Sequence, residues 1–205
     1  MHAWRPPRYA LIAAAAALGV LIGLVAALLR SSHAPAAPPE SMRAQVTWPP
    51  GTKRAPLFAL RDQRGQVVST ASLRGRPVLV TFLDSRCRSA CPVEGRVLST
   101  VLDELKGTNT VLLVVSVNPW SDTPASARDF AAHARWHGDW HWLLGSKATL
   151  APVWRGFGIA VKRVPGDVVH EVALYVVDRH GDLRAAYLFP FSADAVTSGA
   201  RSVAG

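Results

Sequence analysis

The sequence contains little cysteine. Only two of its 205 residues are cysteines, which excludes a small domain held together by several disulfides and a zinc site made of four thiolates. Acidic residues are also scarce: 14 Asp and Glu stand against 23 Lys and Arg, which leaves a formal net charge of +9. Because 49% of the residues are apolar and 18% are charged, we expect most of the chain to fold.

Charge is absent from one long stretch near the N-terminus. Residues 9–29 are apolar, and at 1.5 Å per residue a helix of this length spans about 30 Å, the thickness of a bilayer core. Arg5 and Arg8 precede it, so segment 1–8 is expected in the cytoplasm and the rest of the chain across the membrane. The sequence thus predicts a single-pass transmembrane anchor in a bacterial inner membrane, with a periplasmic domain. A cleavable signal peptide is the alternative, with a cleavage site near Ala36.

Two further segments follow the predicted anchor. Residues 30–56 are predicted to be a linker, because six prolines and little periodicity favour a stiff, extended chain. Residues 57–205 have the composition of a globular domain that is large enough to bury a core. Its cations are spread along the chain without a basic run, which argues against nucleic-acid binding. Attraction to anionic lipid or to an acidic partner is the better interpretation of the charge.

The globular part alternates apolar runs with segments of helical spacing. Two continuous apolar runs are typical of strands that are covered on both faces. Strands that alternate with helices predict an α/β sheet with parallel pairs, and a closing hairpin adds an antiparallel edge. The expected elements are a hairpin at 58–68, strands at 77–83, 110–117 and 140–144, helices at 92–106, 124–137 and 147–157, and a closing hairpin of strands 172–177 and 183–189.

The two cysteines lie where the first buried strand gives way to a helix. Cys87 and Cys91 are four residues apart, so a helical turn brings both sulfurs to one side. The unpaired N–H groups of a helix start, together with Arg86 and Arg88, favour the thiolate form. Thiolates attack disulfides and bind soft metals such as Cu(I). A purely structural disulfide is the alternative, although it would close only a short loop and stabilise the fold little.

The segment 79–92, LVTFLDSRCRSACP, resembles the signature of the SCO/SenC family. The likeness continues through 114–124, through 147–158, and to His170, which lies eleven residues before the glycine of the closing turn. The family consists of membrane-anchored copper chaperones that help to assemble cytochrome c oxidase. The resemblance implies a thioredoxin-like fold, a central mixed sheet flanked by helices. It also implies copper as the bound metal, with Cys87, Cys91 and His170 as its ligands.

Three functions stay open at this point. The first is a copper chaperone that delivers copper to the dinuclear copper centre of cytochrome c oxidase, with the copper-bearing subunit or another periplasmic copper protein as partner. The second is a thiol:disulfide oxidoreductase acting on the cysteines of such a partner, in which Cys87 attacks and Cys91 resolves the mixed disulfide. The third is a tethered interaction module that carries a plain disulfide. Whether the protein is an enzyme therefore depends on which function the dithiol serves.

Other histidines offer a weaker metal candidate. His133 and His137 are spaced as an i, i+4 pair on the expected helix, and His141 follows among three tryptophans. These histidines lack the glutamate that accompanies them in a zinc-protease motif. We interpret the region around Trp136, Trp140 and Trp142 as a solvated or partner-docking surface rather than a second metal site.

Overall fold

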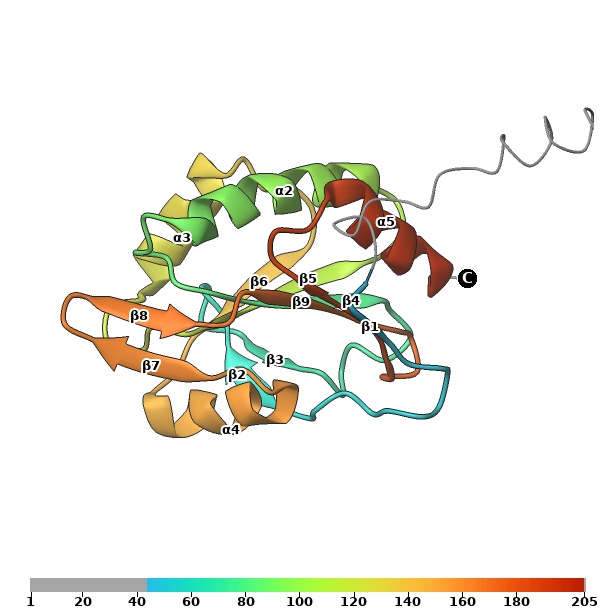
Figure 1. Ribbon diagram of the computed structural model, residues 1–205, viewed down its shortest axis with the longest axis horizontal. Coiled ribbons are helices and arrows are strands. Elements are labelled where there is room, and N and C mark those ends of the chain that lie inside the picture. The colour runs from blue at the N-terminus through green and yellow to red at the C-terminus, as the bar shows by residue number, and fades with distance from the viewer. Residues whose placement is uncertain (1–43, 205) are drawn as a thin grey trace, which may run out of the picture. The chain divides into compact units, whose positions relative to one another are not determined.

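The computed structural model describes residues 44–204, which form one mixed α/β unit (Figure 1). Its centre is a six-stranded sheet in the order β1-β10-β9-β4-β5-β6. β4, β5 and β6 pair in parallel, whereas β9, β10 and β1 add antiparallel pairs on the other side of β4. The sheet strands are β1 (Val46–Thr47), β4 (Val78–Leu83), β5 (Val111–Ser116), β6 (Trp140–Leu143), β9 (Ala173–Val177) and β10 (Leu183–Leu188).

Helices and one small hairpin cover the two faces of the sheet. One face packs against α2, α3 and α5, and the other packs against α4 and the hairpin β2–β3 (Figure 1). A second hairpin, β7–β8, stands apart from the central sheet. These elements are α2 (Ala90–Glu104), α3 (Pro124–His133), α4 (Lys147–Phe157), α5 (Ala193–Ser202), β2 (Ala59–Arg61), β3 (Val67–Ser69), β7 (Val161–Val164) and β8 (Asp167–His170).

The strand β4 is a continuous apolar run because both of its faces are buried. Leu79 and Leu83 face the cluster beneath α2 and α5, while Val80 and Phe82 face the cluster beneath α4. Side chains alternate between the faces of a strand, so a strand that is covered on both faces needs apolar residues at successive positions. The carboxyl end of this central strand is the point where the segment with both cysteines begins.

The main elements expected from the sequence are present, including the parallel strands, the closing hairpin and α4 at its expected bounds. The helix expected over 124–137 is wrong at its end, because it stops at His133. Arg135 takes a positive φ of 58°, which turns the chain so that Trp136 points back into the core. β1, the hairpin β7–β8 and α5 were not expected from the sequence pattern.

Part of the predicted organisation lies outside the described residues. The expected cytoplasmic segment 1–8, the expected anchor 9–29 and the first part of the expected linker fall there. Within 44–204 we find no helix that is both long enough and apolar enough to cross a membrane. The two residues of β1 lie within 30–56 and pair with β10, so the sheet extends into the segment that the sequence predicts as a linker.

Candidate metal centre

A loop from Asp84 to Ser89 connects β4 to α2 and carries Cys87. Cys91 lies in the first turn of α2 and is fully buried, whereas Cys87 is partly exposed. The backbone N–H of Cys87 donates to the carbonyl of Asp84, and the Asp84 carboxylate accepts from the N–H of Arg86 at 2.7 Å. Both cysteines are free thiols. The loop thus holds one accessible and one buried sulfur at the same end of the sheet.

Two acids, the buried Asp84 and the partly buried Asp122, hold this loop in place. The Asp84 carboxylate also accepts from the Asn118 side chain at 3.0 Å. Asp122 accepts from the backbone N–H of Ser85 and from the hydroxyls of Ser85 and Ser116. Burial raises the pKa of Asp122 to about 6, against the lowering effect of its serine donors. These contacts tie the cysteine loop to the segment after β5, so the position of Cys87 depends on two neighbouring strands.

The two thiols differ strongly in acidity. The pKa of Cys87 is lowered to about 5, first because the side chain of Cys91 donates a hydrogen bond to its sulfur, while burial acts in the opposite direction. The Ser89 hydroxyl, 3.5 Å from this sulfur, supports the thiolate as well. Donating that bond and being buried both raise the pKa of Cys91. The pair is therefore one thiolate and one thiol at neutral pH, a form suited to nucleophilic attack by Cys87.

His170 reaches this pair from the end of the hairpin β7–β8. Its Nε2 lies 3.9 Å from the Sγ of Cys91, and its Nδ1 lies 2.9 Å from the carbonyl of Glu171. Because a carbonyl only accepts, Nδ1 carries a proton and donates it to Glu171, and Nε2 is the ring nitrogen that faces the sulfur of Cys91. Such an outer hydrogen bond is the usual way to orient a metal-binding histidine.

The donor set suits a soft metal, although it is not preassembled. Two metal–ligand bonds of about 2 Å each can bridge 3.9 Å, so Cys91 and His170 are close enough to share an ion. Cys87 lies four residues before Cys91, on the loop that leads into α2. Within residues 44–204, however, no three His, Cys, Asp or Glu side chains already stand together in a metal-binding arrangement. Two sulfurs and one imidazole are ligands that favour copper.

A buried carboxyl that the sequence pattern did not single out lies behind the cysteines. Glu94 is fully buried in α2, and its Oε2 has no hydrogen-bond partner among the described residues. Its other oxygen contacts the Thr81 hydroxyl, which also lies 2.9 Å from the carbonyl of Ala173. One hydroxyl proton cannot serve two acceptors, so both contacts are satisfied only when Glu94 is protonated and donates to Thr81. Burial accordingly raises the pKa of Glu94 to about 8.

The second histidine group does not assemble. His133 is exposed on α3, where its ring bonds to the carbonyl of Asp129, and His137 lies beyond the end of that helix. His141 sits instead on β6 between the carboxylates of Asp62 and Asp139, at 2.9 and 3.1 Å.

The interpretation of the tryptophans as a surface is wrong for two of them. Trp136 and Trp142 are buried and stack on each other. The indole N–H of Trp136 donates to the carbonyl of Gly95 at 2.7 Å, which joins the segment after α3 to α2. Trp140 is only partly buried and packs edge-on against Trp136. This part of the sequence therefore builds the core beneath the cysteine loop.

The fold and the site together define a thioredoxin-like protein whose dithiol, at the end of a central strand, is faced by a histidine. Residues 49–204 match the family model described as SCO1/SenC. The chain belongs to the SCO1/SenC family, as the resemblance of its cysteine segment implied.

Known relatives agree with this assignment. The mitochondrial SCO2 homolog of Bos taurus is 32% identical over 158 residues, which cover 70% of this chain and 57% of the bovine protein. Bradyrhizobium japonicum ScoI, solved with copper bound, has a TM-score of 0.65 and 25% identity, over 73% of this chain and 99% of its own. BsSco, described as a member of the Sco family of cytochrome c oxidase assembly proteins and as having a disulfide switch, has a TM-score of 0.67 and 25% identity, over 78% and 98%. Copper, the metal that the sequence implies, is thus the metal bound in a similar structure.

Proposed function

We propose that this protein is a copper chaperone that holds copper through Cys87, Cys91 and His170. It delivers the metal to the dinuclear copper centre of cytochrome c oxidase during assembly. The observation that carries the proposal is the orientation of His170, whose Nε2 faces the sulfur of Cys91 at 3.9 Å while its Nδ1 is held by the carbonyl of Glu171. Copper-bound ScoI and the oxidase-assembly role stated for BsSco support the metal and the pathway. Segment 9–29 is proposed as the membrane anchor that keeps the domain in the periplasm.

The proposed cargo cycle follows from the acidity of the two thiols. Cys87 offers a thiolate at neutral pH, and Cys91 must lose its proton when the ion arrives. Loading therefore releases a proton and is favoured as the pH rises. Because Cys87 is the more exposed sulfur, it is the first ligand that a partner thiolate can replace. Delivery then proceeds by exchange of one ligand at a time, and no substrate is chemically changed.

Anaerobic titration of the reduced full chain with Cu(I), against a competing chelator, tests the proposal. We expect one copper per chain, lost in Cys87→Ser and in Cys91→Ser. His170→Ala should weaken binding about tenfold or more, since even groups outside the ligand shell are worth 10–100-fold. His180→Ala is the matched control, because His180 is exposed in the turn between β9 and β10. Copper affinity in His170→Ala equal to that of the control would remove His170 from the ligand set.

A second function is favoured by a specific observation, the partial exposure of Cys87 beside the buried Cys91. An accessible thiolate beside a buried thiol is the arrangement with which a dithiol attacks a partner disulfide and then releases it. In this role the protein keeps the copper-binding cysteines of its partner reduced. The two functions use the same cysteines but differ in their need for His170. His170→Ala should therefore spare the rate of dithiol exchange, measured with a disulfide peptide, while it lowers copper affinity.

A further inference from the structure

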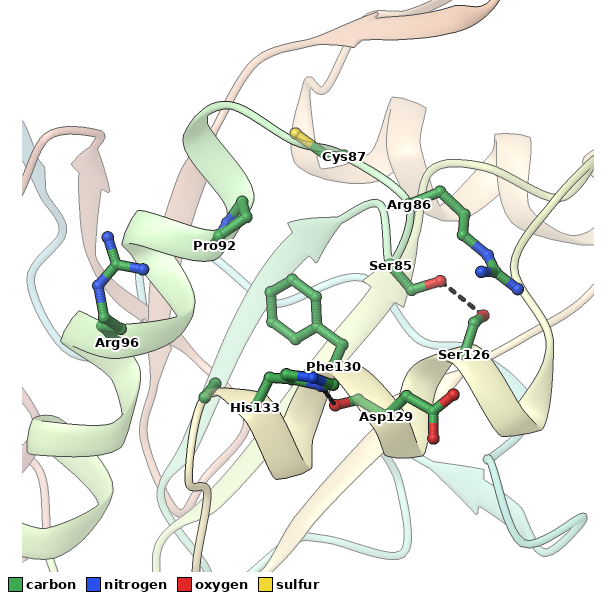
Figure 2. Close-up of a pocket in the computed structure, with 10 residues that line it drawn as sticks. Ser85, Arg86, Cys87, Pro92, Arg96, Ser126, Asp129, Phe130 and His133 are labelled. Carbon is green, nitrogen blue, oxygen red and sulfur yellow. Dashed lines mark hydrogen bonds between the residues drawn. The ribbon is translucent and has the colours of Figure 1, made fainter.

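A cavity of about 440 Å³ opens beside Cys87, between the cysteine loop and helices α2 and α3 (Figure 2). This volume is in the range of pockets that bind small organic molecules. Of the three proposed copper ligands, Cys87 alone lines the cavity. Cys87 therefore stands between two different environments. One holds the buried Cys91 and His170, and the other is this open cavity.

The walls of the cavity carry charges that form no ion pair with any of the residues that the structure describes. Arg86 and Arg96 lie on opposite sides of the Phe130 ring in Figure 2, and both are exposed. The carboxylate of Asp129 lines the same cavity. Among the ion pairs of the described residues, none involves any of these three side chains. The cavity thus offers two guanidinium groups and one carboxylate to a ligand.

The base of the cavity is apolar and well held. Phe130 packs edge-on against Trp136 and Trp142, with ring centroids 5.6 and 5.1 Å apart. At the side below Arg86, the hydroxyls of Ser85 and Ser126 are joined by a hydrogen bond of 2.6 Å (Figure 2). A ligand with an apolar middle and charged ends would rest on the ring and reach the charged groups around it.

We propose that this cavity binds a peptide-sized thiol, or its disulfide, that carries two carboxylates and one ammonium group. The two carboxylates would pair with Arg86 and Arg96, and the ammonium group with Asp129, which places the ligand sulfur next to Cys87. The chemical class is that of glutathione. The inference names a small-molecule substrate for the second function proposed above, and for the exchange reaction it rests on that function.

The exchange reaction follows with its atoms balanced. The Cys87 thiolate attacks one sulfur of the bound disulfide, so that a bond forms to Cys87 while the ligand disulfide breaks. The first ligand thiolate leaves and takes a proton from water. Cys91 then gives its proton to water, attacks the sulfur of Cys87 and releases the second thiolate, which also takes a proton from water. One ligand disulfide is reduced to two thiols, and the protein dithiol is oxidised to a disulfide.

Binding can be measured without any redox step. S-methylglutathione, whose sulfur is blocked, is added to the copper-free, reduced full chain, and the alkylation of Cys87 by iodoacetamide is followed by mass spectrometry. We expect alkylation to slow in a saturable way. Arg96→Gln should raise the half-protecting concentration about tenfold, which is the effect of losing one charge-assisted hydrogen bond. Arg155→Gln, an exposed arginine of α4 that lies outside this cavity, is the charge-matched control and should behave like the unmodified chain.

The outcomes separate this inference from the proposed functions. No protection, or equal protection in Arg96→Gln and the unmodified chain, overturns the assignment of the cavity. Protection by methyl 2-hydroxyethyl sulfide, which has no charge, overturns the role of the arginines. Protection by an acidic peptide but not by S-methylglutathione overturns the choice of a small thiol. Protection without oxidation by glutathione disulfide supports the cavity as a binding site and refutes the exchange reaction with this ligand, whereas the rate with a disulfide peptide tests the oxidoreductase function itself. Copper titration of Arg96→Gln should match that of the unmodified chain.

Discussion

Replacing Glu94 by glutamine is expected to make the fold more stable at alkaline pH. Glu94 is fully buried, and its pKa is raised from 4.5 to about 8, mainly by burial. The folded chain therefore holds this proton more tightly than the unfolded chain does. The stabilisation from the protonated group is complete below the unfolded pKa of 4.5 and is lost as the pH rises through 8. Glutamine stays neutral throughout, so Glu94→Gln should not show this loss.

The size of the stability difference between wild type and Glu94→Gln follows from the shift in the pKa of Glu94. Between the two pKa values each pH unit costs the wild-type fold on the order of 1 kcal/mol, so the difference between wild type and variant should grow by a few kcal/mol between about pH 5 and about pH 8. Urea unfolding of the reduced, metal-free chain, followed by tryptophan fluorescence, measures this difference. Asp103→Asn, at an exposed carboxylate of the same helix, is the control. If wild type and Glu94→Gln lose stability in parallel as the pH rises, the conclusion that Glu94 is a buried, neutral acid is refuted.

Two other substitutions test the site and its support. Cys91→Ala removes the hydrogen bond that stabilises the Cys87 thiolate, so the pKa of Cys87 should rise from about 5 toward that of an ordinary thiol. Ultraviolet absorbance of the thiolate against pH measures this, and an unchanged titration would contradict the assigned cause. Trp136→Phe removes the hydrogen bond to the Gly95 carbonyl and should destabilise the fold by about 1–3 kcal/mol in urea unfolding. Trp120→Phe, on the exposed loop after β5, should cost little; equal losses would argue against this bond.

Much of the fold could be predicted because its strands are covered on both faces. Continuous apolar runs identified β4 and β5, and Ser146 and Gly158 bound α4 as a side-chain N-cap and a left-handed C-cap. The hairpin β7–β8 escaped detection since it is short and mostly exposed. The Pro165-Gly166 pair between its strands, with Gly166 at a φ of 76°, was the available signal.

The candidate site could be predicted only in part. The cysteines were recognisable by their spacing at a strand–helix junction, whereas His170 depended on the family resemblance, because no local pattern links it to residues far away in the sequence. Glu94 could have been found: it lies on the same stripe of α2 as Cys91, Leu98 and Val101, where a charged side chain is out of place. The end of α3 could not have been predicted from the sequence, because the tertiary packing of Trp136 decides where the helix stops.

The separation of His170 from the cysteines has a thermodynamic consequence for copper. In an unfolded chain Cys87 and Cys91 are neighbours, but the proposed third ligand is 79 positions beyond Cys91 and arrives on a hairpin that is not part of the central sheet. Copper held by all three residues would therefore bind the folded chain more tightly than the unfolded one, and the metal would clamp the hairpin to the sheet. Under the proposed function, loading through all three ligands would therefore favour folded over immature chains, so that cargo is taken up preferentially once the chain has folded.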